Sequence, residues 1–250
     1  MKQNKEYEIN MFNDIAKNCY YDVFEESSYK MVIDFIISQK INIKGKILEA
    51  GCGAGAFGKR LLSSFENINI IGVDISPLMV EKAKDEKINY NAICGDLEDK
   101  NLFSKEEFDH IFCPFILHHF PDISKVVENF SYWIKKDGYV IIIEPNGDNP
   151  VDKFSKFCRK ILEFLLGKKF VVKNALTTPN ETDHTIKTYD KFFLLNEFEN
   201  LFKTSFFLIP DTALNIVGKI KDIMFIILRK LFPKANFSGT VVMSIYKKKL

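Results

Sequence analysis

Residues 46–58 read KILEAGCGAGAFG, a short apolar run followed by alternating glycines. The apolar run has the length of a strand, and the residues after the glycines fit a helix. Glycine permits positive φ angles and lets the backbone pass close to a ligand, while the N-terminus of a helix offers free N–H groups to an anion. The stretch therefore predicts a strand, a turn and a helix, with a nucleotide-like ligand at the turn.

Apolar runs of strand length recur along the chain and alternate with helical segments. We expect strands near 69–74, 89–94, 108–113, 139–144, 204–209 and 239–246, and helices within 10–39 and over 56–66, 77–86, 122–136 and 215–232. Ser76 and Pro77 are typical of a helix start, and Asp137-Gly138 of a helix end. Short apolar strands separated by helices predict parallel strands with helices on both faces, because right-handed crossovers connect such strands. The predicted fold class is α/β with a doubly wound sheet.

Composition excludes several classes of protein. The 250 residues are 46% hydrophobic and 27% charged with a formal charge of +2, which does not fit a disordered, collagen-like or coiled-coil chain or a strongly basic nucleic-acid binder. Five cysteines without a C-x-x-C pair indicate neither a zinc site nor a disulfide framework, and we expect no metal. The first 20 residues lack the apolar core of a secretory signal, so we expect a cytoplasmic protein.

The glycine stretch is compatible with two other nucleotide-binding patterns. Gly51-x-Gly53-x-x-Ala56 satisfies the relaxed dinucleotide fingerprint, and Asp74 follows where a carboxylate would accept ribose hydroxyls, which suits an NAD-dependent oxidoreductase. Residues 53–59 come close to a P-loop, but Arg60 stands where a hydroxyl would bind Mg²⁺. A non-catalytic nucleotide-binding module is a further alternative.

A larger set of residues resembles the class I S-adenosylmethionine-dependent methyltransferases. These residues are Glu49, the glycines at 51, 53 and 55, Asp74, and Gly95-Asp96 after the third strand. The sequences LHHF at 117–120 and KDG at 136–138 are similar to motifs of the small-molecule, type 11-like branch of that family. The resemblance covers roughly residues 40–145. It implies a Rossmann-like, seven-stranded sheet that is mostly parallel with an antiparallel last strand.

The resemblance also implies the cofactor, S-adenosylmethionine, and its binding residues. The glycines would line the methionine end, Glu49 would hold the amino group, Asp74 would accept the ribose hydroxyls, and Asp96 would accept from the adenine amino group. The full expected set is Glu49, Gly51, Gly53, Gly55, Asp74, Ile75, Asp96, Leu97, Pro114 and Tyr20. Ionised acceptors that face hydroxyl donors make strong hydrogen bonds, which suits these roles.

The candidate catalytic residues follow the fourth and fifth strands. Methyl transfer is an in-line displacement, so positioning supplies much of the rate and a general base is optional. His118 and His119 lie where ligands bind in such sheets, and Glu144 ends the fifth strand. His184 is a further candidate base, whereas His110 inside a strand suits packing.

The acceptor is expected to be a small, apolar or lipid-like molecule, methylated at O, N or C. Cys113-Pro114-Phe115 stands where amino-group methyltransferases that act on adenine or protein glutamine carry Asp/Asn-Pro-Pro-Tyr/Phe. The sequence departs from that motif by lacking the amide or carboxylate that would orient an amino group, so we expect no nucleic-acid partner. Half of the 24 phenylalanines fall between residues 151 and 235, which favours an apolar pocket for the acceptor. Basic amphipathic segments at 153–169 and 217–234 suit either core packing or peripheral contact with a membrane. The oligomeric state stays open.

We expect one domain over residues 1–250, because no linker rich in Pro, Gly or Ser divides the chain. Within it, residues 1–40 would form an N-terminal helical cap and 41–145 the cofactor-binding half. Residues 146–189 would form a cap insertion, and 190–250 the C-terminal strands and helices.

Overall fold

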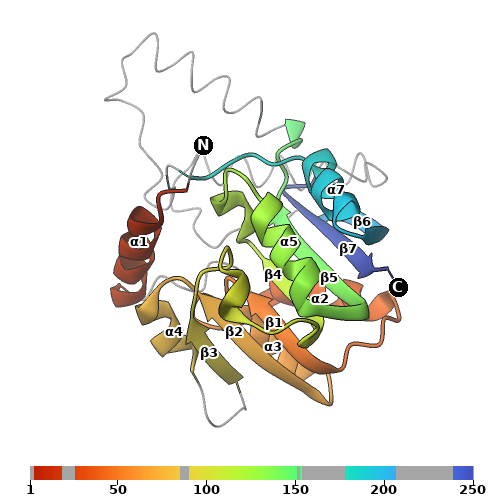
Figure 1. The fold of residues 1–250 in the computed structure, drawn as a ribbon, viewed down its shortest axis with the longest axis horizontal. Helices are drawn as coiled ribbons and strands as arrows, with labels where there is room; N and C mark the ends of the chain where they lie inside the picture. The colour runs from red at the N-terminus through yellow and green to blue at the C-terminus, as the bar shows by residue number, and fades with distance from the viewer. Residues whose placement is uncertain are drawn as a thin grey trace.

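A single seven-stranded sheet forms the centre of the protein (Figure 1). The structure is a computed structural model and describes residues 3–18, 26–84, 90–150, 153, 178, 180–206 and 239–249. The strand order is β3-β2-β1-β4-β5-β7-β6. β7 runs antiparallel to both of its neighbours and the other pairs are parallel, which confirms the predicted sheet. The strands are β1 Gly45–Ala50, β2 Ile68–Asp74, β3 Tyr90–Cys94, β4 Phe108–Pro114, β5 Ile134–Pro145, β6 Phe198–Phe206 and β7 Val241–Lys248.

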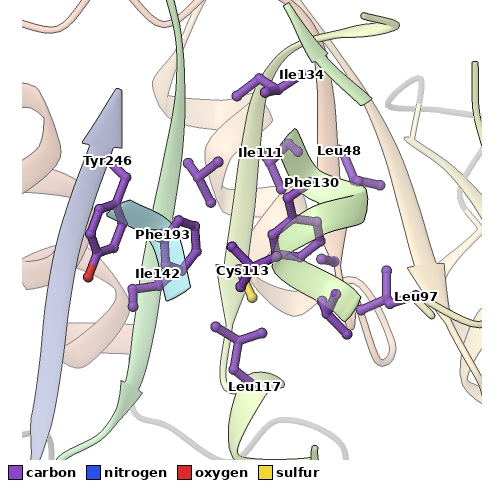
Figure 2. Packing of buried hydrophobic residues seen from close by; sticks show 14 of the residues in the cluster. Leu48, Leu97, Ile111, Cys113, Leu117, Phe130, Ile134, Ile142, Phe193 and Tyr246 are labelled. Carbon is purple, nitrogen blue, oxygen red and sulfur yellow. The ribbon is translucent and has the colours of Figure 1, made fainter. Parts of the chain in front are cut away.

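Helices cover both faces of the sheet. One apolar layer lies under α5 and α7, and the opposite layer lies under α2, α3 and α4. Figure 2 shows the first layer, where Phe193 of α7 stacks on Tyr246 of β7 with ring centroids 4.1 Å apart. The helices are α1 Lys5–Lys17, α2 Glu26–Ser38, α3 Ala56–Ser64, α4 Pro77–Ala83, α5 Ser124–Trp133 and α7 Ile186–Leu195, with short 3-10 helices η2 Lys100–Leu102 and η3 Leu117–His119.

Two helix starts follow from local sequence. Ser76 caps α4, because its hydroxyl accepts a hydrogen bond from the Met79 backbone N–H at 3.2 Å, and Pro77 is the first helical residue. Gly55 caps α3 with a φ of 78°. Both helices therefore begin directly after a strand, at the edge of the sheet where the strands end.

Two predicted boundaries were wrong. α5 ends at Trp133 rather than at Asp137-Gly138, because Ile134 already pairs with Phe108 in the sheet. The pairing then moves to Tyr139, so the residues between lie in an irregular part of β5.

The sixth strand begins at Phe198, six residues before the predicted position, because the buried Phe198 pairs with Lys248 of β7. The predicted helix over 215–232 and the basic segment at 217–234 lie outside the described residues, as does the segment at 153–169 apart from Lys153. Within the described part of the chain, no helix is long and apolar enough to cross a bilayer.

Candidate functional site

A pocket of about 430 Å³ lies at the carboxyl ends of the strands. The ends of β1, β2 and β4 and the loops after β3 and β4 supply its wall. Ten predicted site residues line it: Glu49, Gly51, Gly53, Asp74, Ile75, Asp96, Leu97, Pro114, His118 and His119. Gly55 caps α3 and Glu144 is fully buried, and neither lines the pocket. Tyr20 lies outside the described residues.

The glycine turn is shaped by two residues with positive φ. Gly51 has a φ of 70°, and a Cβ there would come within 2.5 Å of the Ile116 side chain. Gly53 has a φ of 50°, and a Cβ there would meet no atom within 4 Å. The Gly53 backbone thus faces open space in the pocket wall, which leaves room for a ligand to contact the backbone closely.

Asp74 ends β2 and anchors the glycine turn. Its Oδ2 accepts from the Gly53 N–H and its Oδ1 from the Ser76 N–H, each at 2.9 Å. Burial raises the pKa of Asp74. A carboxylate offers about four acceptor positions, so capacity remains for hydroxyl donors that enter the pocket.

Asp96, after β3, is paired with a residue that the sequence analysis did not select. Its Oδ2 lies 2.5 Å from Lys5 Nζ of α1, and its Oδ1 accepts from the Glu98 N–H at 2.9 Å. Lys5 also reaches Glu98 at 2.5 Å. A ligand amino group that binds at Asp96 would therefore share its carboxylate with Lys5.

Glu49 lies beneath the glycine turn and is 1% exposed. Its carboxylate accepts from the Gly58 N–H at 3.1 Å and from the Tyr90 hydroxyl. A Cβ at Gly58 would lie 2.0 Å from Glu49 Oε2, so the carboxylate occupies the space that the glycine leaves open. Burial raises the pKa of Glu49 to about 7.

Glu144 and His118 form a hydrogen-bonded pair. Glu144 Oε1 accepts from the N–H groups of Ile116 and Leu117 at 2.9 and 2.7 Å. Its Oε2 lies 2.8 Å from His118 Nδ1. An imidazole that donates from Nδ1 to a carboxylate keeps Nε2 as its acceptor. Because His118 lines the pocket, the pair presents a fixed imidazole to a bound molecule.

His119 lies next to His118 and contacts α1, with the two imidazole ring centroids 4.1 Å apart. His119 Nδ1 is 3.3 Å from Glu8 Oε2, and Asn180 donates to Glu8 Oε1 at 2.6 Å. Burial favours a higher pKa for Glu8, but the neighbouring His119 and the hydrogen bond from Asn180 lower it overall.

An N-terminal helical cap was expected, but the residues through which α1 forms part of the pocket wall were not predicted. Glu8, Phe12 and Ile15 of α1 line the pocket together with Gln3, which precedes the helix, and Figure 1 shows α1 beside α4. Sequence periodicity indicated a helix in this region. A buried glutamate on a helix with many exposed charges has no sequence signal that separates it from its neighbours.

The other two histidines do not line the pocket, and each has a structural partner. His184 Nε2 donates to the Phe120 carbonyl at 2.8 Å. His110 stacks on Tyr139, and burial lowers its pKa to about 4. Among the described residues, no group of histidine, cysteine and acidic side chains has the arrangement of a metal site.

A family model described as a methyltransferase domain matches residues 41–200, which is more than half of the chain. The chain belongs to the methyltransferase-domain family. This match confirms the resemblance found in the glycine stretch and the strand ends.

Two curated relatives and one solved structure illustrate the match. Malonyl-[acyl-carrier protein] O-methyltransferase 1 of Ilyobacter polytropus is 30% identical over 159 residues, 62% of this chain and 58% of its own length. Ubiquinone biosynthesis O-methyltransferase of Coxiella burnetii is 33% identical over 109 residues, 41% of this chain and 44% of its own length. The chain thus spans about half the length of these curated relatives.

A SAM-dependent methyltransferase structure from Methanosarcina mazei has a TM-score of 0.60 at 18% identity. The alignment covers 86% of this chain and 97% of that one. At this identity the likeness concerns the fold, which agrees with the Rossmann-like sheet described above.

Proposed function

We propose that the protein is a methyltransferase that transfers the methyl group of S-adenosylmethionine to a small, apolar or lipid-like acceptor. The observation that carries this proposal is the convergence of the glycine turn, Asp74, Asp96 and His118 on one pocket. Membership of the methyltransferase-domain family supports it.

The pocket residues fit the cofactor by their chemistry. The open backbone at Gly53 suits the methionine end, and the Asp74 carboxylate suits the two ribose hydroxyls. Asp96 suits the adenine amino group, with Ile75 and Leu97 against the ring. Acidic groups in the wall favour a cationic ligand, and the cofactor supplies an electrophilic methyl group on a positively charged sulfur.

His118 is proposed as the general base, with Glu144 as its positioning residue. Because the Glu144 carboxylate accepts a hydrogen bond from His118 Nδ1, Nε2 is the nitrogen that takes a proton from the methyl acceptor. His118→Ala should lower turnover of an accepted substrate by about a hundredfold or more and leave the affinity for S-adenosylhomocysteine unchanged. Unchanged turnover would show that the acceptor needs no base from His118.

The proposed acceptor follows from the rest of the wall. Its apolar lining includes Phe12, Ile15, Phe57, Met79 and Phe115. The curated relatives reported above are named O-methyltransferases, which favours oxygen as the methylated atom.

We also propose that the chain is one domain and acts in the cytoplasm. The segments at 153–169 and 217–234 are the part of the chain that would contact a membrane.

Calorimetric titration tests the proposal directly. The purified protein is titrated with S-adenosylmethionine, S-adenosylhomocysteine and NADH in parallel. We expect micromolar affinity for both adenosyl ligands and none for NADH. Tight NADH binding without a response to the adenosyl ligands would reject the methyltransferase function and assign Asp74 to a dinucleotide ribose.

A further inference from the structure

Glu8 is a buried carboxylate in the pocket wall, and the proposed cofactor binding gives it no role. It lies on α1, is 1% exposed and lines the pocket. Asn180 holds its Oε1 at 2.6 Å, which fixes the direction of the carboxylate. Within the described part of the chain, Glu8 Oε2 makes no hydrogen bond.

His119 presents a second unsatisfied atom beside it. Its Nδ1 is buried, lies 3.3 Å from Glu8 Oε2, and has no hydrogen-bond partner among the described residues. Buried polar atoms are nearly always hydrogen-bonded, so two adjacent exceptions in a pocket wall indicate that a ligand completes them. One polar group on a bound molecule can reach both atoms.

The charge of the wall selects the chemistry of that polar group. Among the described residues no lysine or arginine lines the pocket, whereas five acidic residues do: Glu8, Glu49, Asp74, Asp96 and Glu181. An anionic group at Glu8 would place like charges together away from water, which disfavours its binding. A hydrogen-bond donor at the same place satisfies Oε2.

We propose that Glu8 and His119 form the subsite for the acceptor's polar head, which is a hydroxyl or a protonated amine and not a carboxylate or phosphate. The inference rests on the proposed function and adds the class of acceptor. The adjacent His118 ring, 4.1 Å from that of His119, places this head beside the proposed base. The apolar lining then receives the body of the molecule.

Three eight-carbon probes that differ in their head group test the subsite. Octylamine, octanol and octanoate are titrated at neutral pH into protein saturated with S-adenosylhomocysteine. We expect octylamine and octanol to bind about tenfold or more tightly than octanoate. Glu8→Gln keeps an oxygen for the Asn180 amide and removes the charge, so it should reduce the preference for octylamine over octanoate to within about threefold.

Glu6→Gln is the matched control, because Glu6 is exposed on the same helix and its loss changes the net charge equally. This variant should keep the preference of the wild type. Equal binding of octanoate and octylamine to the wild type, or an unchanged preference in Glu8→Gln, would overturn the inference.

Cofactor affinity separates this inference from the proposed function. Glu8→Gln should bind S-adenosylhomocysteine as the wild type does. A large loss of that affinity in Glu8→Gln, with a folded protein by circular dichroism, would make Glu8 a cofactor residue and overturn the acceptor subsite. If the wild type itself does not bind S-adenosylhomocysteine, the proposed function fails before the head-group comparison begins.

Discussion

Glu49 shows how one buried acid links the stability of the protein to its pocket. The carboxylate is held by the Gly58 N–H and the Tyr90 hydroxyl, yet burial still raises its pKa from 4.5 to about 7. The folded state therefore binds a proton that the unfolded state has already released between these two pH values. Unfolding free energy falls as pH rises through that window, because the unfolded state binds fewer protons there.

Glu49→Gln should remove this dependence. Below about pH 4.5 the glutamic acid is neutral in both states, whereas above about pH 7 the folded wild type holds a buried charge. The stability of Glu49→Gln relative to the wild type should therefore increase by up to about 3 kcal/mol between pH 5 and 8. Urea unfolding curves at each pH measure the difference.

The exposed Glu66, which follows α3, provides the matched control. Glu66→Gln removes one negative charge from the surface and should change little with pH relative to the wild type. A constant difference between Glu49→Gln and the wild type across the range would show that Glu49 is ionised in the folded protein throughout.

Several predicted site residues that line the pocket stand where backbone geometry restricts the choice of residue. Alternating glycines require a turn, Asp74 ends β2, and Asp96 follows β3, and these strands must finish at one edge of the sheet. Lys5 and Glu8 were not predicted, because their positions depend on how α1 packs over that edge. Helical periodicity alone does not encode that packing direction.

At the scale of elements, the strands around the pocket were predicted to within one or two residues. β1, β2 and β4 are continuous apolar runs bounded by turns, which is typical of buried parallel strands. β6 was misplaced because it is an edge strand with mixed burial, in which Leu201 and Phe202 are each 39% exposed. Its position is set by pairing with β7, a contact that is distant in sequence.

At the scale of the whole molecule, the pairing of β6 with β7 connects the C-terminal strands to the rest of the sheet. β7 lies between β5 and β6, and seven of its eight residues, Val241–Tyr246 and Lys248, are buried. Tyr246 stacks on Phe193, and its hydroxyl donates to Asp190 at 2.9 Å. The last strand in sequence is therefore an interior strand that joins β6 and α7 to the parallel part of the sheet.

A chain that ends at Thr240 should not fold cooperatively. It would leave β5 and β6 without their common partner and lose several buried side chains, each of which stabilises the fold by about 1.5–3 kcal/mol. Together these contributions are of the same order as the net stability of about 5–15 kcal/mol that is typical of a folded domain. Thermal melting followed by circular dichroism should therefore show no sharp transition. A chain that ends at Lys248 keeps every pair of β7 and loses the bond from the Lys249 N–H to the Glu197 carbonyl, so it should melt within a few degrees of the full chain. A sharp transition at the same temperature in the shorter chain would mean that the parallel strands and their helices fold without β7.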